Sequence, residues 1–324
     1  GLGDVYKRQI FTNALKKKKL PGRSGRFLSM AHIDLQSDRA LADCFSSYYC
    51  KKIEDCGVPL SWQGEKIGIL EEKICTLLKK AAISGVVFRE DQVELLFSSA
   101  QEVQQYLEQQ AYAWFQIGYW PSWRQERCTV YREQGREALF TLPRPAFRIF
   151  GLLSEAVHMT GWVKGKEDYY WLGQRAAHKR IAPRLWDNTA CGCVQAGETV
   201  LRALVRESQE EAGVEKRLLA SALPARIVEI CRPLEIGVQY ERIYSFGLPL
   251  AQRWQPNNQD GEVHCFAQKS QQEIIALIIQ GKFMLDSALA LSLIWQANGH
   301  LHPSSPLDRF LQSLLNERVF SYSN

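Results

Sequence analysis

The sequence predicts an α/β protein in which helices cover both faces of a mixed β-sheet, preceded by a small α+β domain. In the second half of the chain, strand-like alternation predominates, interrupted by one amphipathic helical segment and followed by two or three more. In the first half, short helical and strand-like segments alternate. We therefore expect an N-terminal domain at residues 30–135, an α/β/α sandwich at 136–302 and a C-terminal helix within 303–324.

The charge of the chain is concentrated at its start. The whole chain of 324 residues carries a net charge of +5, whereas residues 1–29 alone carry +7. The remainder is therefore slightly acidic and gives no reason to expect nucleic-acid binding. We expect residues 1–29 to be a non-native or disordered basic tail, with Met30 as a candidate initiator. The chain has no apolar run of about eighteen residues, so we expect no membrane partner.

The cysteines and the absence of two common motifs limit the classes of protein to which this sequence can belong. Nine cysteines occur without a CxxC pair, which favours reduced thiols and a cytoplasmic location over a disulfide framework or a zinc site. The sequence has neither a GxSxG elbow nor a GxxxxGK(S/T) loop, so serine-hydrolase and P-loop chemistry are excluded. Any catalytic site in this chain is therefore expected to be of another kind.

The N-terminal elements follow from periodicity. Helical periods are found at residues 41–55, 71–82 and 99–116. A strand pair is expected at 59–70, turning at Gln63-Gly64, and strand alternation continues at 86–97. The polar stretch 131–140 is the expected domain boundary.

The second half of the chain supplies the predicted sheet. Strand patterns are found at residues 147–165, 168–176, 222–234, 237–250 and 263–270. The first two are expected to pair through a turn at 164–166. Helical patterns follow at 270–280, 286–299 and 307–320. Strands with helices before and after them predict a sheet covered on both faces.

Residues 192–214 carry the strongest functional signal. Glu207, Glu210 and Glu211 stand at i, i+3 and i+4 of a predicted helix, so their carboxylates share one face. Leucines and alanine on the next face can pack on a sheet. Three crowded like charges repel unless a cation sits among them, and Mg²⁺, with Mn²⁺ as an alternative, suits carboxylate oxygens. A solvated acidic face is the competing interpretation.

The full pattern is more specific than the three glutamates. Gly192 and Glu198 stand at fixed distances before the pairs Arg206-Glu207 and Glu210-Glu211, and Gly213 follows as an expected helix cap. This pattern resembles the Nudix box. Membership of the Nudix family implies a Nudix α/β/α sandwich and Mg²⁺-dependent hydrolysis of a small-molecule diphosphate. The sequence departs from the family at Ser208, where an aliphatic residue is usual.

The resemblance also implies roles by position. Glu207, Glu210 and Glu211 would hold Mg²⁺, Glu198 would contribute to the metal shell or its hydrogen bonding, and Arg206 would orient a neighbouring glutamate. One of these glutamates, or Glu262 in a polar loop, would accept the proton of the attacking water.

Other polar residues are candidates for contacts with the substrate. Three cations before the box can meet phosphate oxygens, although surface solubility explains them equally well: Lys179, Arg180 and Arg184. Gln239 and Glu241 lie on a predicted strand that can face the same cleft. His158 has no partner pattern in the sequence, so we interpret it as structural.

A second, softer resemblance covers most of the chain. It rests on residues 147–163, 186–193, 240–250, 260–266 and 288–303, which are similar to a Nudix subfamily with an extra N-terminal domain. That subfamily is associated with thiamine diphosphate metabolism. The resemblance implies removal of phosphate from damaged (oxo- and oxy-) thiamine diphosphates. The chain departs from the subfamily at Cys193, where a second glycine is usual.

Two alternatives remain open. Isopentenyl diphosphate isomerase shares the fold and uses a cysteine near the box, as Cys191 or Cys193 would be, although the intact box argues against it. A non-catalytic ligand sensor with the N-terminal domain as effector is the other, and the complete carboxylate set weakens that interpretation.

Overall fold

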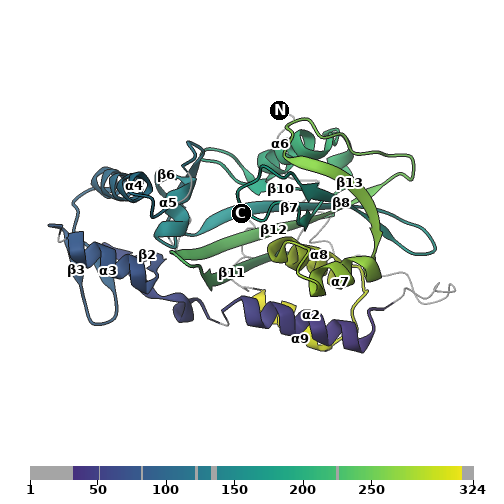
Figure 1. The fold of residues 1–324 in the computed structure, drawn as a ribbon, viewed down its shortest axis with the longest axis horizontal. Coiled ribbons are helices and arrows are strands. Elements are labelled where there is room, and N and C mark those ends of the chain that lie inside the picture. Colours follow the sequence, from purple (N-terminus) through teal and green to yellow (C-terminus); the bar gives the residue numbers. More distant parts are fainter. Residues whose placement is uncertain are drawn as a thin grey trace.

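A computed structural model describes residues 32–50, 52–81, 83–120, 123–132, 137–223 and 226–315. The predicted basic tail at 1–29 and the end of the predicted C-terminal helix lie outside these residues. Two lobes lie side by side along the longest axis of the molecule (Figure 1). The smaller lobe comes from the first half of the chain, and the larger lobe holds the long central sheet.

The smaller lobe contains a four-stranded sheet in the order β2-β1-β4-β3 and a separate strand pair, β5 with β6. Its strands are β1 (Val58–Trp62), β2 (Glu65–Leu70), β3 (Val86–Phe88), β4 (Val93–Leu95), β5 (Arg127–Tyr131) and β6 (Ala138–Pro143). Its helices are α3 (Glu72–Ala81) and α4 (Ala100–Gln116). The predicted turn at Gln63-Gly64 is confirmed: both residues have positive φ, 54° and 78°, as a two-residue hairpin turn requires.

The larger lobe is built on a seven-stranded sheet with the path β11-β12-β7-β8-β13, with β10 paired to β7 and β9 to β8. Its strands are β7 (Ser154–Val163), β8 (Tyr169–Arg175), β9 (Trp186–Asp187), β10 (Ala190–Cys193), β11 (Ile227–Pro233), β12 (Val238–Leu250) and β13 (Val263–Ser270). β12 runs parallel to β7, whereas β8 and β10 run antiparallel to it. The predicted mixed sheet is confirmed.

Helices cover both faces of this sheet. Helix α6 (Val200–Ala212) packs on one face, where Tyr244 of β12 joins its core. Helices α7 (Gln271–Ile279) and α8 (Leu285–Ala297) pack on the other, where the next residue back, Ile243, is fully buried. Successive strand residues point to opposite faces, so each strand contributes to two cores. The α/β/α sandwich predicted from the sequence is confirmed. In the described part of the chain, no helix is both long and apolar enough to cross a bilayer.

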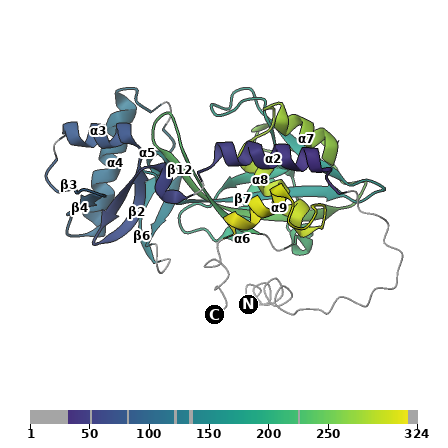
Figure 2. The same cartoon turned by 90° about the horizontal axis from the view of Figure 1, so that it is seen from below.

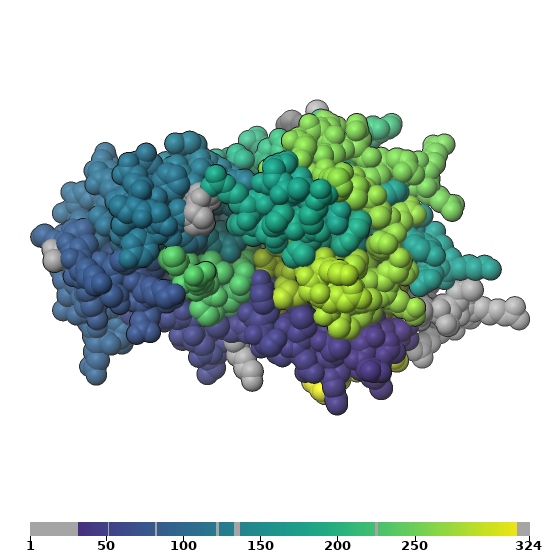
Figure 3. All heavy atoms as spheres, viewed as in Figure 1, coloured from purple at the N-terminus to yellow at the C-terminus, as the bar shows by residue number. Residues whose placement is uncertain are grey.

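Helix α2 (Leu35–Tyr48) differs from the prediction in where it packs. We expected it in the N-terminal domain, but it lies against α7 and α9 (Pro306–Leu314) of the larger lobe. Figure 3 shows this purple segment along the lower edge, against the yellow-green C-terminal helices, and Figure 2 shows it from below. The Asp38 carboxylate ties the two helices together by accepting from the Ser305 hydroxyl and the Leu307 amide at 2.7 and 2.9 Å.

A second difference lies just before β7. Residues 147–150 were expected to begin a strand, but α5 (Arg144–Ile149) is a short helix. Pro145 suits its first turn, and Gly151 follows with φ 56°. A side chain at Gly151 would meet the Ile69 carbonyl oxygen at 2.0 Å. The glycine therefore lets β7 start only after a turn packed against the smaller lobe.

The packing of α2 generates a stability prediction. Phe45 is fully buried between α2 and the C-terminal helices, so Phe45→Ala should lower the free energy of unfolding by about 3–5 kcal/mol. Leu35→Ala on the same helix is the control, because Leu35 is 65% exposed; its effect should stay within about 0.5 kcal/mol. Urea denaturation followed by tryptophan fluorescence measures both. Equal, small effects would show that α2 is not part of this core.

Candidate active site

A cavity of about 540 Å³ lies beside α6, and both halves of the chain line it. The larger lobe supplies α6, β7, β10 and the loops around residues 179 and 261. The segment before it supplies Trp120, Arg124, Glu126 and two arginines of α5. The predicted acidic helix therefore faces a partly open cavity rather than a flat surface.

Helix α6 has the predicted ends. The Thr199 hydroxyl caps its first turn by accepting from the Arg202 amide, and Gly213 closes it in a left-handed conformation with φ 66°. Ser208, the departure from the usual aliphatic residue, is fully buried, and its hydroxyl has no hydrogen-bond partner in the described part of the chain. An unpaired buried hydroxyl is destabilising by about 1–3 kcal/mol. Serine at this position therefore lowers the stability of the protein and leaves the carboxylates of the box in place.

The Arg206 guanidinium lies among the carboxylates of the box. It donates to both Glu198 oxygens at 3.0 and 2.9 Å, to Glu207 at 2.6 Å and to Glu210 at 3.3 Å. It also donates to the Cys193 carbonyl at 3.0 Å. The predicted orienting role of Arg206 has this geometric basis: one cation fixes three glutamates and the end of β10.

Strand β10 approaches α6 closely. A Cβ atom at Gly192 would lie 2.0 Å from the Glu207 Oε1 atom, so a side chain here would displace this carboxylate from its present position. One residue earlier, the Cys191 amide donates to Glu211 Oε2 at 2.7 Å. Gly192 of the box therefore lets the Glu207 carboxylate lie against the strand.

Burial shifts the protonation of two box carboxylates. Desolvation raises the pKa of Glu207 to about 7, against the lowering effect of Arg206. Desolvation also raises the pKa of Glu211 well above its usual range, and Asp187 adds to the shift. Charged carboxylates in this position therefore need more positive charge than the protein supplies.

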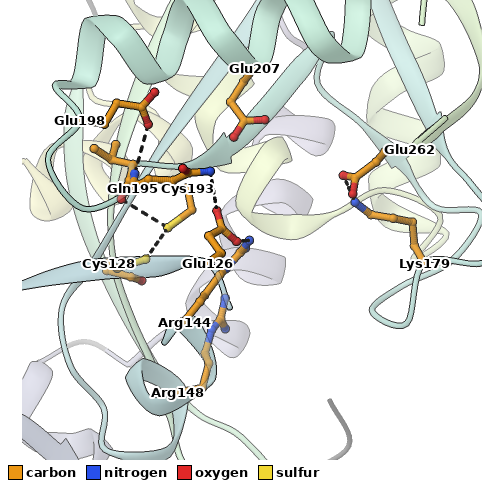
Figure 4. Close-up of polar contacts among 12 residues, drawn as sticks. Glu126, Cys128, Arg144, Arg148, Lys179, Cys193, Gln195, Glu198, Glu207 and Glu262 are labelled. Carbon is orange, nitrogen blue, oxygen red and sulfur yellow. Dashed lines mark hydrogen bonds and ion pairs between the residues drawn. The ribbon is translucent and has the colours of Figure 1, made fainter. Parts of the chain in front are cut away.

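The loop before β13 brings two further carboxylates, Asp260 and Glu262, to α6. Single oxygen atoms of Glu211, Asp260 and Glu262 lie within 4.8 Å of one another. Lys179 forms a short ion pair with Glu262 (Figure 4). Burial by itself would raise the pKa of Glu262, but Lys179 outweighs it and the net shift is downward. Glu262 is therefore held ionised beside α6. Asp260 is not among the site residues predicted from the sequence.

Of the predicted substrate residues, Lys179, Arg180 and Glu241 line the cavity. Arg184 and Gln239 are not among the described residues of its wall, and neither is Glu198, which was predicted to contribute to the metal shell. Arg184 is exposed and has a left-handed backbone conformation with φ 65°. The buried Gln239 amide instead bridges two carboxylates of the wall, Glu241 and Asp286, at 2.9 Å each.

Two arginines of α5 form part of the wall that sequence analysis missed. Arg144 donates to Glu126 Oε2 at 3.1 Å, and Arg148 lies 3.9 Å from Glu241 Oε1. In Figure 4 both arginines lie on the side of the site opposite Glu207. The strand predicted at 147–165 includes Arg148 but not Arg144, so the sequence analysis does not show that the two arginines share one helix face four residues apart.

Cys191 belongs to a hydrogen-bonded network at the base of the cavity. Its thiol donates to Asp187 at 3.3 Å, and Arg175 donates to the other Asp187 oxygen at 2.8 Å. Desolvation raises the pKa of Cys191 well above its usual value, with Asp187 and Glu211 adding to it. Although ligand atoms of His158, Asp187 and Cys191 lie within 4.8 Å of one another, Arg175 already neutralises the aspartate and the thiol stays protonated.

These features define a Nudix-type domain, with a glycine-bounded acidic helix over a mixed sheet. Comparison with known proteins agrees: residues 156–272 match the NUDIX domain family model, and this part of the chain is a NUDIX domain. Nudix hydrolase 24, chloroplastic, of Arabidopsis thaliana is 29% identical over 188 residues, which cover 57% of this chain and 52% of that protein. The chain thus spans about half the length of this relative.

Two further similarities were found. An isopentenyl-diphosphate Delta-isomerase of Mycolicibacterium vanbaalenii is 43% identical over 53 residues, covering 16% of this chain and 29% of that protein. A crystal structure from Deinococcus radiodurans has 21% identity and a TM-score of 0.41, covering 52% of this chain and 99% of that one.

Nudix enzymes generally use divalent cations, and the residues here fit one. Glu207, Glu210, Glu211 and Asp260 all line the cavity, and oxygen atoms of Glu211, Asp260 and Glu262 lie within 4.8 Å of one another. Carboxylate oxygen is the donor type that hard cations prefer. Burial raises the pKa values of Glu207 and Glu211, and a bound cation would stabilise their charged forms.

Cation binding should therefore depend on pH. The pKa of Glu207 is raised to about 7, so below that pH a proton occupies a site that the cation needs, and binding releases it. Isothermal titration with Mg²⁺ should give a weaker apparent affinity at pH 6 than at pH 8, with more protons released at pH 6. The rise in melting temperature caused by Mg²⁺ should likewise be larger at pH 8. Equal affinity at both pH values would contradict this account.

Proposed function

We propose that this protein is a Mg²⁺-dependent hydrolase that cleaves the phosphoanhydride bond of a substituted diphosphate. The observation that carries the proposal is the opposition of charges across one cavity. Box carboxylates line one side, and Arg144 and Arg148 line the other. A diphosphate bridged to α6 by a cation would place its remaining oxygens toward the arginines, whose planar forks suit phosphate.

The residues of the chain divide the chemistry between them. When bound by Glu207, Glu210 and Glu211, the cation would polarise a phosphoryl oxygen and activate a water. Glu262, held ionised by Lys179, or one of the box glutamates accepts the proton of that water as it attacks phosphorus. Arg206 touches no substrate in this scheme and acts by positioning Glu207 and Glu210. The products are a monophosphate and phosphate.

Damaged thiamine diphosphate, in its oxo or oxy form, is the substrate that we favour. The resemblance of several segments to the thiamine-associated subfamily supports this choice. The cavity of about 540 Å³ is large enough for a two-ring diphosphate ester. Cys193, where that subfamily usually has glycine, is buried against Cys128 with 3.1 Å between their sulfur atoms, so its side chain points away from the cavity wall.

An isopentenyl diphosphate isomerase is the second candidate, supported by the local match to such an enzyme and by the position of Cys191 in the cavity wall. The protonated, hydrogen-bonded state of this thiol makes it a weaker candidate. Solvent-proton exchange into isopentenyl diphosphate without phosphate release would favour the isomerase over the hydrolase.

Removing single box carboxylates tests the proposed hydrolase. Glu210→Gln and Glu211→Gln should each lower Mg²⁺-dependent phosphate release from oxo-thiamine diphosphate by about a hundredfold or more, because each removes charge from the cation site. Glu215→Gln is the matched control, since Glu215 lies beyond the helix end with a 61% exposed side chain; its rate should be unchanged. Excess EDTA should abolish turnover by the wild-type protein. Turnover that persists in EDTA would refute the proposal.

A further inference from the structure

His158 on β7 is a buried histidine with one ring nitrogen left open. It is 6% exposed and lines the cavity. Its Nδ1 atom lies 2.9 Å from Asn188 Oδ1 and 3.4 Å from the Ser287 hydroxyl. In the described part of the chain, Nε2 has no hydrogen-bond partner. The sequence-based interpretation of His158 as purely structural accounts for only one of its two nitrogens.

The neighbours of His158 fix which nitrogen carries the proton. Asn188 Nδ2 donates to Thr160 Oγ1 at 2.8 Å and to the Ser287 carbonyl at 3.2 Å. A carbonyl can only accept, so the Asn188 amide nitrogen must face it and the amide oxygen must face the histidine. His158 Nδ1 is therefore the donor. The Ser287 hydroxyl gives its own proton to Asp187 and does not compete.

With Nδ1 donating to Asn188, the neutral tautomer of the ring carries its lone pair on Nε2, the nitrogen without a partner among the described residues. Two buried carboxylates, Glu241 and Asp286, line the cavity with it. The Gln239 amide donates to one oxygen of each carboxylate at 2.9 Å. The Ser154 hydroxyl donates to the other Glu241 oxygen at 3.2 Å, and Tyr49 donates to the other Asp286 oxygen at 2.7 Å. Arg148 lies 3.9 Å from Glu241 Oε1. Each carboxylate oxygen can accept a further hydrogen bond, so this part of the wall still offers acceptors to a ligand.

We propose that His158 Nε2, together with Glu241 and Asp286, forms a subsite that binds the organic group of the substrate by accepting hydrogen bonds from its ring N–H or amino groups. This inference rests on the proposed function for the diphosphate end. Buried acceptors left unpaired destabilise a complex, so the subsite selects against organic groups that carry no donor. Aminopyrimidine rings and nucleobases satisfy it, whereas an isoprenoid chain does not.

A pair of substitutions separates the two nitrogens of His158. His158→Asn keeps a donor for Asn188 and removes the acceptor in the cavity, whereas His158→Gln can place an amide oxygen near the position of Nε2. The probes are thiamine diphosphate and cytidine diphosphate, which carry ring amino groups, and isopentenyl diphosphate, which has no donor. His264→Asn, at an exposed histidine on β13, is the control.

His158→Asn should raise KM for the two amino-bearing probes by about tenfold and change their kcat by less than about threefold. KM for isopentenyl diphosphate should not rise, and His158→Gln should recover part of the lost affinity. A fall in kcat of similar size for all three probes would overturn the proposal, because His158 would then act on the reacting atoms. Unchanged KM values in His158→Asn would overturn it as well.

Binding without phosphate tests the subsite independently of hydrolysis. Calorimetric titration of thiamine into the Mg²⁺-free protein should detect binding by the wild type and His264→Asn, and at least tenfold weaker binding by His158→Asn. If no diphosphate is hydrolysed, the proposed function fails, yet this difference would still support the subsite. Equal binding of thiamine by wild type and His158→Asn, or no binding by either, would overturn the subsite even in an active hydrolase.

Discussion

The site depends on the placement of one guanidinium among several carboxylates. Arg206 contacts Glu198, Glu207 and Glu210 at once, and its side chain is only 23% exposed. Without it, three acidic side chains would share a partly buried space without a countercharge, which is strongly unfavourable. With it, the carboxylates are gathered but not neutralised, because the pKa of Glu207 stays raised. The arrangement is thus stable enough to fold and still short of positive charge, as a cation site must be.

The same contacts hold the sheet to the helix. Arg206 also binds the Cys193 carbonyl, and Glu211 binds the Cys191 amide, so two residues of the short strand β10 are hydrogen-bonded to side chains of α6. Gly192 between them allows the close approach. Substitutions at these positions would therefore affect folding and cation binding together. A variant with altered activity at this strand needs a stability measurement beside it before a catalytic role can be assigned.

The features that depend on nearby residues could be predicted from the sequence, whereas contacts between residues far apart in the chain could not. The acidic face of α6 follows from spacing within four residues, and the mixed sandwich follows from strand and helix periods. Asp260, Arg144 and Arg148 reach the cavity only through the fold, and none of them lies in a pattern with the box. The second half of α5 falls in the predicted strand because its apolar residues run directly into β7, and the local signals of the helix are confined to Pro145 and Gly151. The position of α2 depends on contacts with residues more than 230 positions away, which no local period encodes.

Residues from the smaller lobe form part of the cavity wall. Trp120, Arg124 and Glu126 follow α4, and the hairpin of β5 and β6 leads directly into α5. These residues line the same cavity as the box. A sensor domain that reports on a separate ligand would need a site of its own, whereas this segment completes the wall of the NUDIX domain. This segment of the smaller lobe therefore contributes directly to the cavity wall. In the proposed scheme, contacts from α5 to phosphate and contacts near His158 to the organic group both come from this wall, so the wall residues, rather than the acidic helix, would decide which diphosphate is bound.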